Sequence, residues 1–538
     1  MEKLYNNIVL PQEWPPQYTV DQYLDKQPVP YLENPPEVID ISLGRQLFVD
    51  DFLIEKTDLV PEYHKAKKYE GNPIFKPEMP WELENLQPCT TPKGGGVWYD
   101  KKENKFKMWY EASWLRNMAY AESEDGIHWN RPNLDIEPGT NKILTYDRSI
   151  AEGLMDIEEG LHPEEKFLGH LRPDSTTVWI DDDTTDVQQR YKMFLRNPGG
   201  YWPGILMTSP DGIHWENTEF TFPVYDRSTI FYNAFRKKWV YSIRDSVTVS
   251  NHAISETGWI RTRAYAENDQ FLGGFSDESK KVHWLSADRD TLANPYIGFS
   301  PQLYNVDAIA YESIMIGMFQ VMRGPENDIC EEYGTPKITE LLAMYSRDGF
   351  HFTRPTDTPI INASIADGEW DKGYVQSVGG TCMVVGDEIW IYYTGFAGEM
   401  SQGKLDWTNG NGIYANGATG LAKLRRDGFV SMNAKERGTL LTKPLIFTDK
   451  KYLFANFDGK VRVTLLDCDM NELVKSAWTE ADCTCCRIDL GDFDIYGLSG
   501  KTFRMQFEVE GGKLYSFWFS HSEQGESGGY TGAGYKEV

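Results

Sequence analysis

The chain has 538 residues, too many for one ordinary core, and 40% of them are hydrophobic and 14% aromatic. Because 81 acidic residues outweigh 54 basic ones, the net charge of −27 repels phosphate backbones and anionic membranes, which excludes a nucleic-acid role and a membrane role from the expected functions. No apolar run approaches the roughly 20 residues of a membrane span. The first 20 residues also lack a basic region followed by an apolar one, so we expect a cytoplasmic protein unless a leader has been removed.

Residues 1–60 form the first predicted unit. They are rich in proline up to about Pro36 and finish with the strand-like sequence QLFVDDFLI. This composition predicts an extended arm that wraps on the following domain and ends in one strand.

Residues 61–437 carry paired strand signals. Segments such as GGGVWYDKKENKFKMWYEA and STIFYNAFRKKWVYSIRD join an aromatic strand, a polar turn and a second aromatic strand. Amphipathic helical stretches are few. The pattern predicts an all-β protein.

A seven-residue phrase recurs along this region and indicates its repeat. Ser and Asp can bond the backbone of their own turn, Gly supplies positive φ, and the final aromatic residue packs back under the hairpin. We therefore interpret the phrase as a structural turn between strands and not as a ligand loop. The copies are SEDGIHW at 123–129, SPDGIHW at 209–215, SRDGFHF at 346–352, the weaker RRDGFVS at 425–431 and the degenerate SETGWI at 255–260.

The spacing of the turn glycines predicts a five-bladed β-propeller. They recur about once per four-stranded sheet plus insertions, and radial repetition protects the edges of such sheets. The five glycines are Gly126, Gly212, Gly258, Gly349 and Gly428, and the predicted blades lie near 88–135, 170–222, 224–268, 300–356 and 372–434.

The region after the propeller reads differently. Residues 438–525 alternate as strands without further copies of the phrase, which predicts a β-sandwich, and the Gly-rich residues 526–538 read as a loose, flexible tail. The seven cysteines are too scattered for a disulfide framework. The cluster CTCC at 483–486 with Cys468 allows a zinc site, but buried strand residues are the favoured interpretation, and we expect no metal and no cofactor.

Residues just before each inner strand of a propeller meet at one mouth, which gives a filter for site residues. Asp174 lies four residues before Val178, and Asp226 lies four residues before Ile230 in the next blade. For the fourth blade the sequence offers Glu312, with Asp307 as a second choice. For the fifth it offers Gln376.

Two or three carboxylates at one mouth are what cleavage of a glycosidic bond requires. One carboxyl group donates a proton to the leaving oxygen, and another stays ionised as a nucleophile or base. We assign Glu312 as the acid and Asp226 or Asp174 as the base or stabiliser. The alternative is that both aspartates only cap strand ends through backbone hydrogen bonds.

Further residues near these carboxylates are candidates for substrate binding. Arg172, Arg227 and Arg244 can hold a carboxylate ionised or grip an anionic substrate, although an arginine within a strand can equally form a structural ion pair. Trp98 is either a sugar platform or blade core.

A five-bladed arrangement with inner-strand carboxylates and a following sandwich resembles the glycoside hydrolases of families 32, 43 and 68. The stretch GKVRVTLLDCD…GLSGKTFRMQFEVEGGKLYSFWF is similar to the sandwich of family 32, and NPIFKPEMPWE is similar to the entry of family 130, which includes mannoside phosphorylases. The chain departs from family 32 at its nucleophile, because Thr91 stands in CTTPKGG where that family has Asp in N-D-P-N-G. Its R-D-P motif is matched only loosely by Arg172-Pro173-Asp174, and Asp226 stands in the blade that carries its acid.

The resemblance and the carboxylates together predict a glycoside hydrolase with a carbohydrate substrate. A glycoside phosphorylase of the family 130 kind is the first alternative, suggested by the basic residues near the acids. A carbohydrate-binding propeller without catalysis is the second, suggested by the missing aspartate at Thr91.

Overall fold

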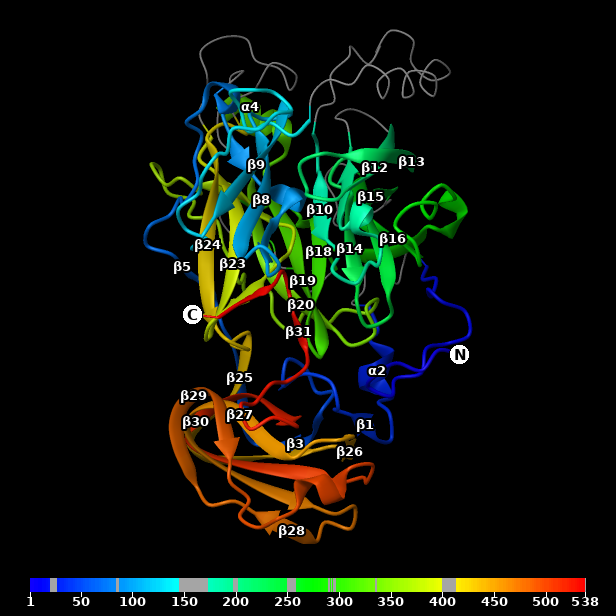
Figure 1. Ribbon diagram of the computed structural model, residues 1–538, viewed down its shortest axis with the longest axis vertical. Coiled ribbons are helices and arrows are strands. Elements are labelled where there is room, and N and C mark those ends of the chain that lie inside the picture. The colour runs from blue at the N-terminus through cyan, green and yellow to red at the C-terminus, as the bar shows by residue number, and fades with distance from the viewer. Residues whose placement is uncertain are drawn as a thin grey trace.

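The protein consists of two β-rich bodies stacked along its long axis (Figure 1). The computed structural model describes residues 1–19, 27–83, 87–144, 173–196, 202–248, 258–288, 291, 293, 297–333, 336–398 and 413–537. Among them only short helices occur, including α2 (Pro30–Glu33) and α4 (Asn327–Tyr333). The all-β prediction is confirmed. No helix within these ranges is long and apolar enough to cross a membrane.

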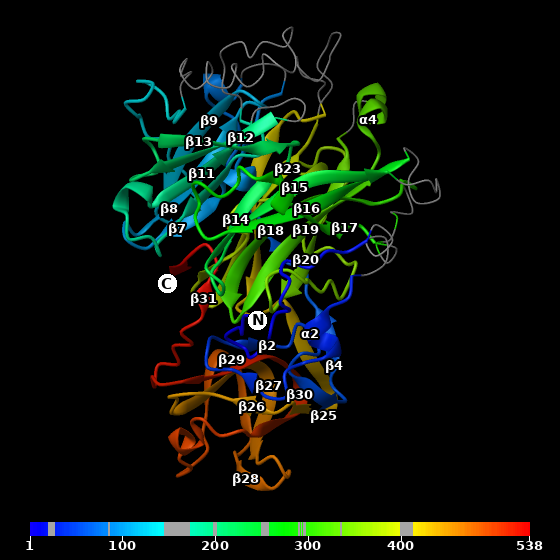
Figure 2. The same cartoon turned by 90° about the vertical axis from the view of Figure 1, so that its right-hand side faces the viewer.

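The larger body contains five mainly antiparallel sheets arranged around one axis. Figure 2 shows this body above the smaller one. Blade 1 comprises β6 (Thr90–Thr91), β7 (Val97–Asp100), β8 (Lys105–Ala112) and β9 (Asn117–Ser123). Blade 2 comprises β10 (Thr177–Ile180), β11 (Tyr191–Leu195), β12 (Trp202–Ser209) and β13 (Glu216–Val224). Blade 3 comprises β14 (Thr229–Asn233), β15 (Lys238–Thr248), β16 (Trp259–Asn268) and β17 (Val282–Ser286).

The remaining two blades borrow strands from the ends of the chain. Blade 4 comprises β18 (Gln302–Glu312), β19 (Ile314–Gly324), β20 (Ile338–Ser346) and β31 (Tyr530–Thr531). Blade 5 comprises β21 (Gly373–Ser377), β22 (Met383–Val385), β23 (Glu388–Phe396), β24 (Gly417–Arg425), β5 (Lys67–Lys68) and β32 (Tyr535–Lys536).

Hydrogen bonds between neighbouring blades close the ring. The Arg227 N–H of blade 3 donates to Ser175 Oγ of blade 2 at 2.7 Å, and the Gly379 N–H of blade 5 donates to the Lys93 carbonyl of blade 1 at 2.7 Å. Between blades 4 and 5, Thr339 Oγ1 donates to the Val375 carbonyl at 2.6 Å. The predicted five-bladed propeller is confirmed.

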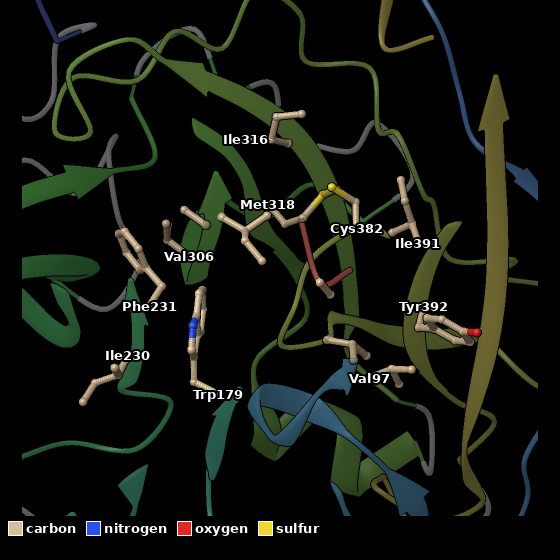
Figure 3. Packing of buried hydrophobic residues seen from close by; sticks show 14 of the residues in the cluster. Val97, Trp179, Ile230, Phe231, Val306, Ile316, Met318, Cys382, Ile391 and Tyr392 are labelled. Carbon is tan, nitrogen blue, oxygen red and sulfur yellow. The ribbon is translucent and has the colours of Figure 1, made fainter. Parts of the chain in front are cut away.

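Apolar side chains from adjacent blades fill the space between the sheets (Figure 3). Val97, Trp179, Ile230 and Val306 lie on four successive inner strands and are each less than a tenth exposed. Because both faces of an inner strand are covered, these strands are apolar at nearly every position, and the few polar side chains at their ends stand out.

Copies of the recurring turn form hydrogen bonds with the preceding blade. In the copy at 209–215, the Asp211 carboxylate accepts from the N–H groups of Ile213 and His214 at 2.8 Å, and Gly212 has φ +79°. Trp109 of blade 1 donates its indole N–H to the Gly212 carbonyl at 2.7 Å, so a Cβ at Gly212 would lie 2.6 Å from that ring. Tyr392 bonds Gly126 and Trp284 bonds Phe350 in the same way. The interpretation as a structural turn agrees with this geometry.

The degenerate copy SETGWI differs from the others. Residues 255–257 lie outside the described ranges, and Gly258 directly precedes β16, the third strand of its blade. The copies at 123–129, 209–215 and 346–352 instead follow the third strand. Blade 3 also continues to Ser286, beyond the predicted boundary at 268.

The smaller body is built on one eight-stranded sheet that bends around its own core. Three long strands change direction at bulges, and one of these bulges lies beside Gly459. The single sheet therefore encloses a hydrophobic core that two separate sheets enclose in an ordinary sandwich. Its strands are β2 (Gln46–Leu47), β3 (Ile54–Thr57), β4 (Val60–Tyr63), β25 (Val430–Thr442), β27 (Tyr452–Leu466), β28 (Glu472–Lys475), β29 (Thr479–Ile488) and β30 (Arg504–Ser520), and β1 (Ile39–Asp40) pairs with β26 (Leu445–Ile446) beside it.

The two ends of the chain tie the bodies together. The N-terminal arm contributes β2, β3 and β4 to the smaller body, and the predicted strand QLFVDDFLI is interrupted between β2 and β3. The expectation of a loose tail is wrong for residues 526–537, because β31 pairs with β18 and β32 pairs with β22. Glycine allows the tail to lie close to Glu312, since a Cβ at Gly529 would lie 2.2 Å from Glu312 Oε2.

Candidate functional site

The ends of the inner strands gather charged side chains around the propeller axis, and we call this region the mouth. Asp174 and Asp226 precede β10 and β14. The second strand of blade 2 ends beside Asp174, and that of blade 3 passes beside Asp226. Thr177 pairs with Phe194 and Thr229 pairs with Ser242, so continuation of each register sets an arginine of the second strand, Arg196 or Arg244, near the aspartate.

Asp226 is ion-paired and partly open to solvent. Its Oδ1 lies 2.6 Å from Arg244 Nη1, and its side chain is 37% exposed. Burial alone would raise the pKa of this carboxyl, but Arg244 and three further arginines outweigh that effect and lower it. The further arginines are Arg196, Arg227 and Arg261. Asp226 is therefore held as a carboxylate.

Asp174 lies on the neighbouring blade, as its position in the sequence predicted. Its backbone N–H donates to the Arg196 carbonyl at 2.8 Å, and its Oδ2 lies 3.3 Å from Arg196 Nη1. Arg196 also feels the charge of Asp226, which links the two aspartates through one guanidinium. Arg172, the third arginine singled out from the sequence, lies outside the described residues.

Glu111 joins the mouth from blade 1, although sequence reasoning did not select it. It is the last residue but one of β8, pairs across the sheet with Thr91, and forms an ion pair with Lys93. Burial raises the pKa of Glu111, Lys93 opposes that shift, and the charge of Asp174 adds to it. Among the described carboxyl groups with a resolved shift, Glu111 is the one whose pKa is raised.

A sequence signal for Glu111 does exist. The second strands of blades 1 and 2 read KMWYE and KMFLR, so Glu111 and Arg196 each follow a lysine by four residues at the same end of their strands. Comparison of second strands between blades would have found both residues. The inner strands alone do not carry this signal.

An aromatic and cationic wall completes the mouth on blades 4 and 5. Lys337 Nζ lies 3.3 Å from the Tyr304 hydroxyl and 5.3 Å from the ring centres of Tyr374 and Tyr414. Burial raises the pKa of Tyr304, yet Lys337 and Arg261 lower it by more, so its pKa falls below the usual value. Tyr414 in turn stacks on Trp114, with ring centres 4.1 Å apart.

Arg227, Asp307 and Gln376 are all buried near the axis. Asp307 accepts from Asn305 Nδ2 at 2.8 Å and from the Ser377 hydroxyl. Within the described part of the chain, neither amide atom of Gln376 has a hydrogen-bond partner, and the same holds for all three guanidinium nitrogens of Arg227. These predicted residues do come together, with several polar atoms unsatisfied.

Glu312 does not belong to the mouth, which corrects its assignment as the acid. It ends β18, five residues beyond Asp307, or about 17 Å along an extended strand. There it is fully buried against the smaller body, where Oε2 accepts from the Arg45 N–H at 3.0 Å and from Ser527 Oγ at 2.7 Å, and Oε1 lies 3.3 Å from Arg426 Nη2. Its role is structural.

Trp98 is also not a sugar platform. It is 4% exposed, its indole N–H donates to the Val178 carbonyl at 3.1 Å, and its ring packs edge-on against Trp179 at 4.7 Å. Trp98 therefore belongs to the core between blades 1 and 2.

The donor set of the mouth suits proton transfer. Carboxyl groups with raised and lowered pKa values lie beside several cations there, and within the described ranges no three His, Cys, Asp or Glu side chains are placed to hold a metal ion. The arrangement offers a proton donor, a fixed carboxylate and cationic groups for a polar ligand.

Comparisons with known proteins find structural neighbours only. No family model and no curated protein matches the sequence. Among solved structures, an N-acetylgalactosamine deacetylase from F. plautii aligns with a TM-score of 0.40 and 13% identity over 70% of this chain and 96% of its own. A β-1,2-mannobiose phosphorylase from Listeria innocua gives 0.40 and 14% over 68% and 98%, and a family 32 β-fructofuranosidase from Bombyx mori gives 0.37 and 10% over 84% and 94%. Likeness at this level leaves the activity of this chain to be argued from the side chains of the mouth.

Proposed function

We propose that this protein cleaves glycosidic bonds with the carboxyl groups at the propeller mouth. The observation that carries the proposal is the opposite displacement of two pKa values within one cluster, that of Glu111 upward and that of Asp226 downward. Glycosidic cleavage needs one protonated and one ionised carboxyl group, and separated environments supply that pair.

The roles follow from the surroundings of each group. Glu111, buried beside the negative charge of Asp174, keeps its proton to higher pH and donates it to the leaving oxygen. Asp226, paired with Arg244, stays ionised and acts on the anomeric carbon directly or through a water molecule. Asp174 lies between them and positions Arg196.

The test is a search for turnover on a panel of oligosaccharides and aryl glycosides, followed by substitution at the mouth. Glu111→Gln and Asp226→Asn should each lower the rate on the best substrate about 10²- to 10⁴-fold, the usual contribution of a positioned acid or base. Asp367→Asn is the matched control, because Asp367 is a surface residue paired only with Lys372 and should leave the rate unchanged.

Two results would refute the proposal. One is full activity of Glu111→Gln and Asp226→Asn on a confirmed substrate. The other is binding of a glycan without any turnover across the panel, which would identify a carbohydrate-binding propeller without catalysis.

A further inference from the structure

Arg227 occupies an unusual place at the start of the inner strand of blade 3. Its backbone has φ +61°, its N–H donates to Ser175 Oγ, and its carbonyl accepts from Arg263 Nη2 at 2.8 Å. These bonds fix the backbone between two blades. Its charge interacts with Tyr374, Tyr304, Asp174 and Asp307, which come from blades 5, 4 and 2, so the guanidinium lies near the axis.

The guanidinium of Arg227 has no hydrogen-bond partner among the described residues. The residue is 2% exposed, and Nε, Nη1 and Nη2 are all unsatisfied. Neighbouring arginines differ, because Arg244 pairs with Asp226 and Arg261 pairs with Glu326 at 3.1 Å. Burying an ionised group without a partner costs free energy. The presence of Arg227 at this place therefore indicates a ligand that pairs with its guanidinium.

Positive charge is in excess throughout the mouth. Of the described side chains there, seven are cationic and five are carboxyl groups, in a chain whose net charge is −27. Burial, reinforced by Arg227 and Arg244 and opposed by Asp307, lowers the pKa of Arg263 to about 9. The cations are Lys93, Arg196, Arg227, Arg244, Arg261, Arg263 and Lys337, and the carboxyl groups are Glu111, Asp174, Asp226, Asp307 and Glu326.

This excess conflicts with cleavage of a neutral sugar. The transition state of glycosidic cleavage carries positive charge on the sugar ring, which an uncompensated guanidinium on the axis would oppose. The conflict disappears when the ligand itself brings a negative group. The planar fork of a guanidinium matches the two oxygens of a carboxylate or a phosphate.

We propose that Arg227 anchors an oxyanion-binding subsite on the propeller axis, filled by a carboxylate or phosphate group of the ligand. Gln376 of blade 5, whose amide is also unsatisfied among the described residues, is a neutral donor on another inner strand. The proposal deepens the proposed function, and it rests on that function only for the step that follows binding.

Two sources can supply the oxyanion. One is the carboxylate of an acidic sugar in the glycan. The other is inorganic phosphate as a second reactant, in which case a phosphate oxygen bonds to the anomeric carbon while the glycosidic C–O bond breaks. The proton of hydrogen phosphate then ends on the freed alcohol oxygen, and the products are a sugar 1-phosphate and the shortened glycan.

Calorimetric titration of the full chain with inorganic phosphate, glucuronate and glucose tests the subsite. We expect phosphate or glucuronate to bind and glucose to bind far more weakly. Arg227→Met should weaken oxyanion binding about 10- to 100-fold, as expected for loss of a charge-assisted bidentate contact. Arg487→Met is the matched control, because it removes a surface arginine of the smaller body and should change nothing.

The outcome also identifies the source. Binding of phosphate alone indicates phosphorolysis, and binding of glucuronate alone indicates an acidic glycan. The proposal is overturned if neither binds the unaltered protein, or if Arg227→Met binds oxyanions as tightly as Arg487→Met does. Arg227→Lys, which keeps the charge but loses the fork, provides the same comparison if the methionine variant does not fold.

Failure of the subsite and failure of the proposed function can be told apart. Oxyanion binding that persists in Glu111→Gln while turnover is never found refutes cleavage and leaves the subsite intact. Turnover of neutral glycans that is unaffected by Arg227→Met refutes the subsite and leaves cleavage intact.

Discussion

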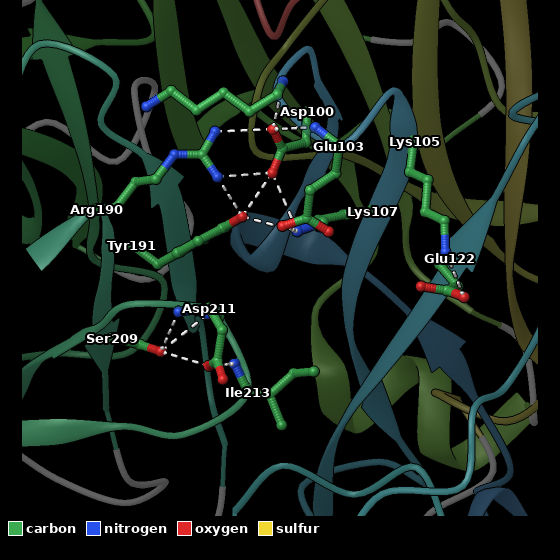
Figure 4. A network of polar contacts seen from close by, with 12 residues as sticks. Asp100, Glu103, Lys105, Lys107, Glu122, Arg190, Tyr191, Ser209, Asp211 and Ile213 are labelled. Carbon is green, nitrogen blue, oxygen red and sulfur yellow. Dashed lines mark hydrogen bonds and ion pairs between the residues drawn. The ribbon is translucent and has the colours of Figure 1, made fainter. Parts of the chain in front are cut away.

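Two buried ionic clusters of the propeller differ in how completely their members are paired. The first, which we call the complete network, joins blades 1 and 2 through Asp100, Lys107, Arg190 and Tyr191 (Figure 4). Asp100 is fully buried and accepts from both terminal nitrogens of Arg190 at 2.8 Å and from the Tyr191 hydroxyl at 2.6 Å. At the mouth, Arg227 is also buried, but its guanidinium donates to no acceptor among the described residues.

This difference in pairing distinguishes a cluster that stabilises the fold from a cluster that can bind a ligand. A network that satisfies every member stabilises the contact between blades and has nothing left to bind. A cluster that leaves a guanidinium and an amide unsatisfied gives up stability and keeps donors free for a ligand. Burial and charge alone would not have distinguished the two clusters.

The largest effect is expected from breaking the complete network. Asp100→Leu removes the buried carboxylate that Arg190 and Lys107 share. The two cations keep only the half-exposed Asp182 and Glu103 as partners, so the free energy of unfolding should fall by up to about 3–5 kcal/mol. Urea denaturation at neutral pH measures the loss. Glu122→Gln is the control in the same region, because the partly exposed pair of Glu122 with Lys105 should contribute less than about 1 kcal/mol.

The pH dependence of that loss has a defined sign. Burial raises the pKa of Asp100, but Arg190, Tyr191 and Lys107 lower it further, so its folded-state pKa lies below the unfolded value of 3.8. Its contribution is thus present above pH 3.8 and fades as the pH falls below it. Equal acid sensitivity of the unaltered protein and Asp100→Leu would contradict the assignment.

A smaller effect, of opposite sign, is expected at the mouth. Arg227→Met removes an unpaired buried charge and should leave the unliganded protein as stable as before, or raise its free energy of unfolding by up to about 1–3 kcal/mol. Thermal unfolding without phosphate measures it. Arg244→Met should instead lower stability, since it strips Asp226 of its closest partner, and a loss in Arg227→Met as large as that in Asp100→Leu would remove the contrast between the clusters.

The smallest effect concerns the pH range of activity. Turnover should need ionised Asp226, whose pKa is lowered, and protonated Glu111, whose pKa is raised. The rate should therefore hold at low pH and fall about tenfold per unit once the pH passes the pKa of Glu111. With an activated aryl glycoside, Glu111→Gln should lose this alkaline limb, and a limb that persists would assign it to another group.

The repeat could be recognised in the sequence because the hydrogen bonds that form each turn are local. Each copy of the turn phrase carries its own Ser and Asp bonds and a glycine with positive φ, so the sequence shows it wherever it occurs. Counting the copies predicted five blades and placed Asp174 and Asp226 at the starts of inner strands. The copy at 255–260 counted correctly, but its last two residues already belong to the third strand of its blade.

The errors concern distances along and between strands. Glu312 was selected by its neighbours in sequence, but the length of β18 carries it to the far end of the blade. The Gly-rich tail reads as loose because glycine usually marks flexible segments, whereas here its small size admits a strand beside Gly44 and Glu312. Neither the position of Glu312 nor the pairing of the tail can be predicted from the few residues that surround it in the sequence.

The sequence by itself therefore determined the all-β class, the number of blades and three of the mouth carboxylates, because short-range bonds and strand periodicity fix these. Only the tertiary structure decided which charges are paired. Arg190 and Arg227 both accompany acidic residues in sequence. Arg190 pairs with Asp100 across a blade contact, whereas Arg227 meets no acceptor in the described ranges. Ion pairing depends on side chains that the fold brings together from different blades, and no local sequence pattern predicts these contacts.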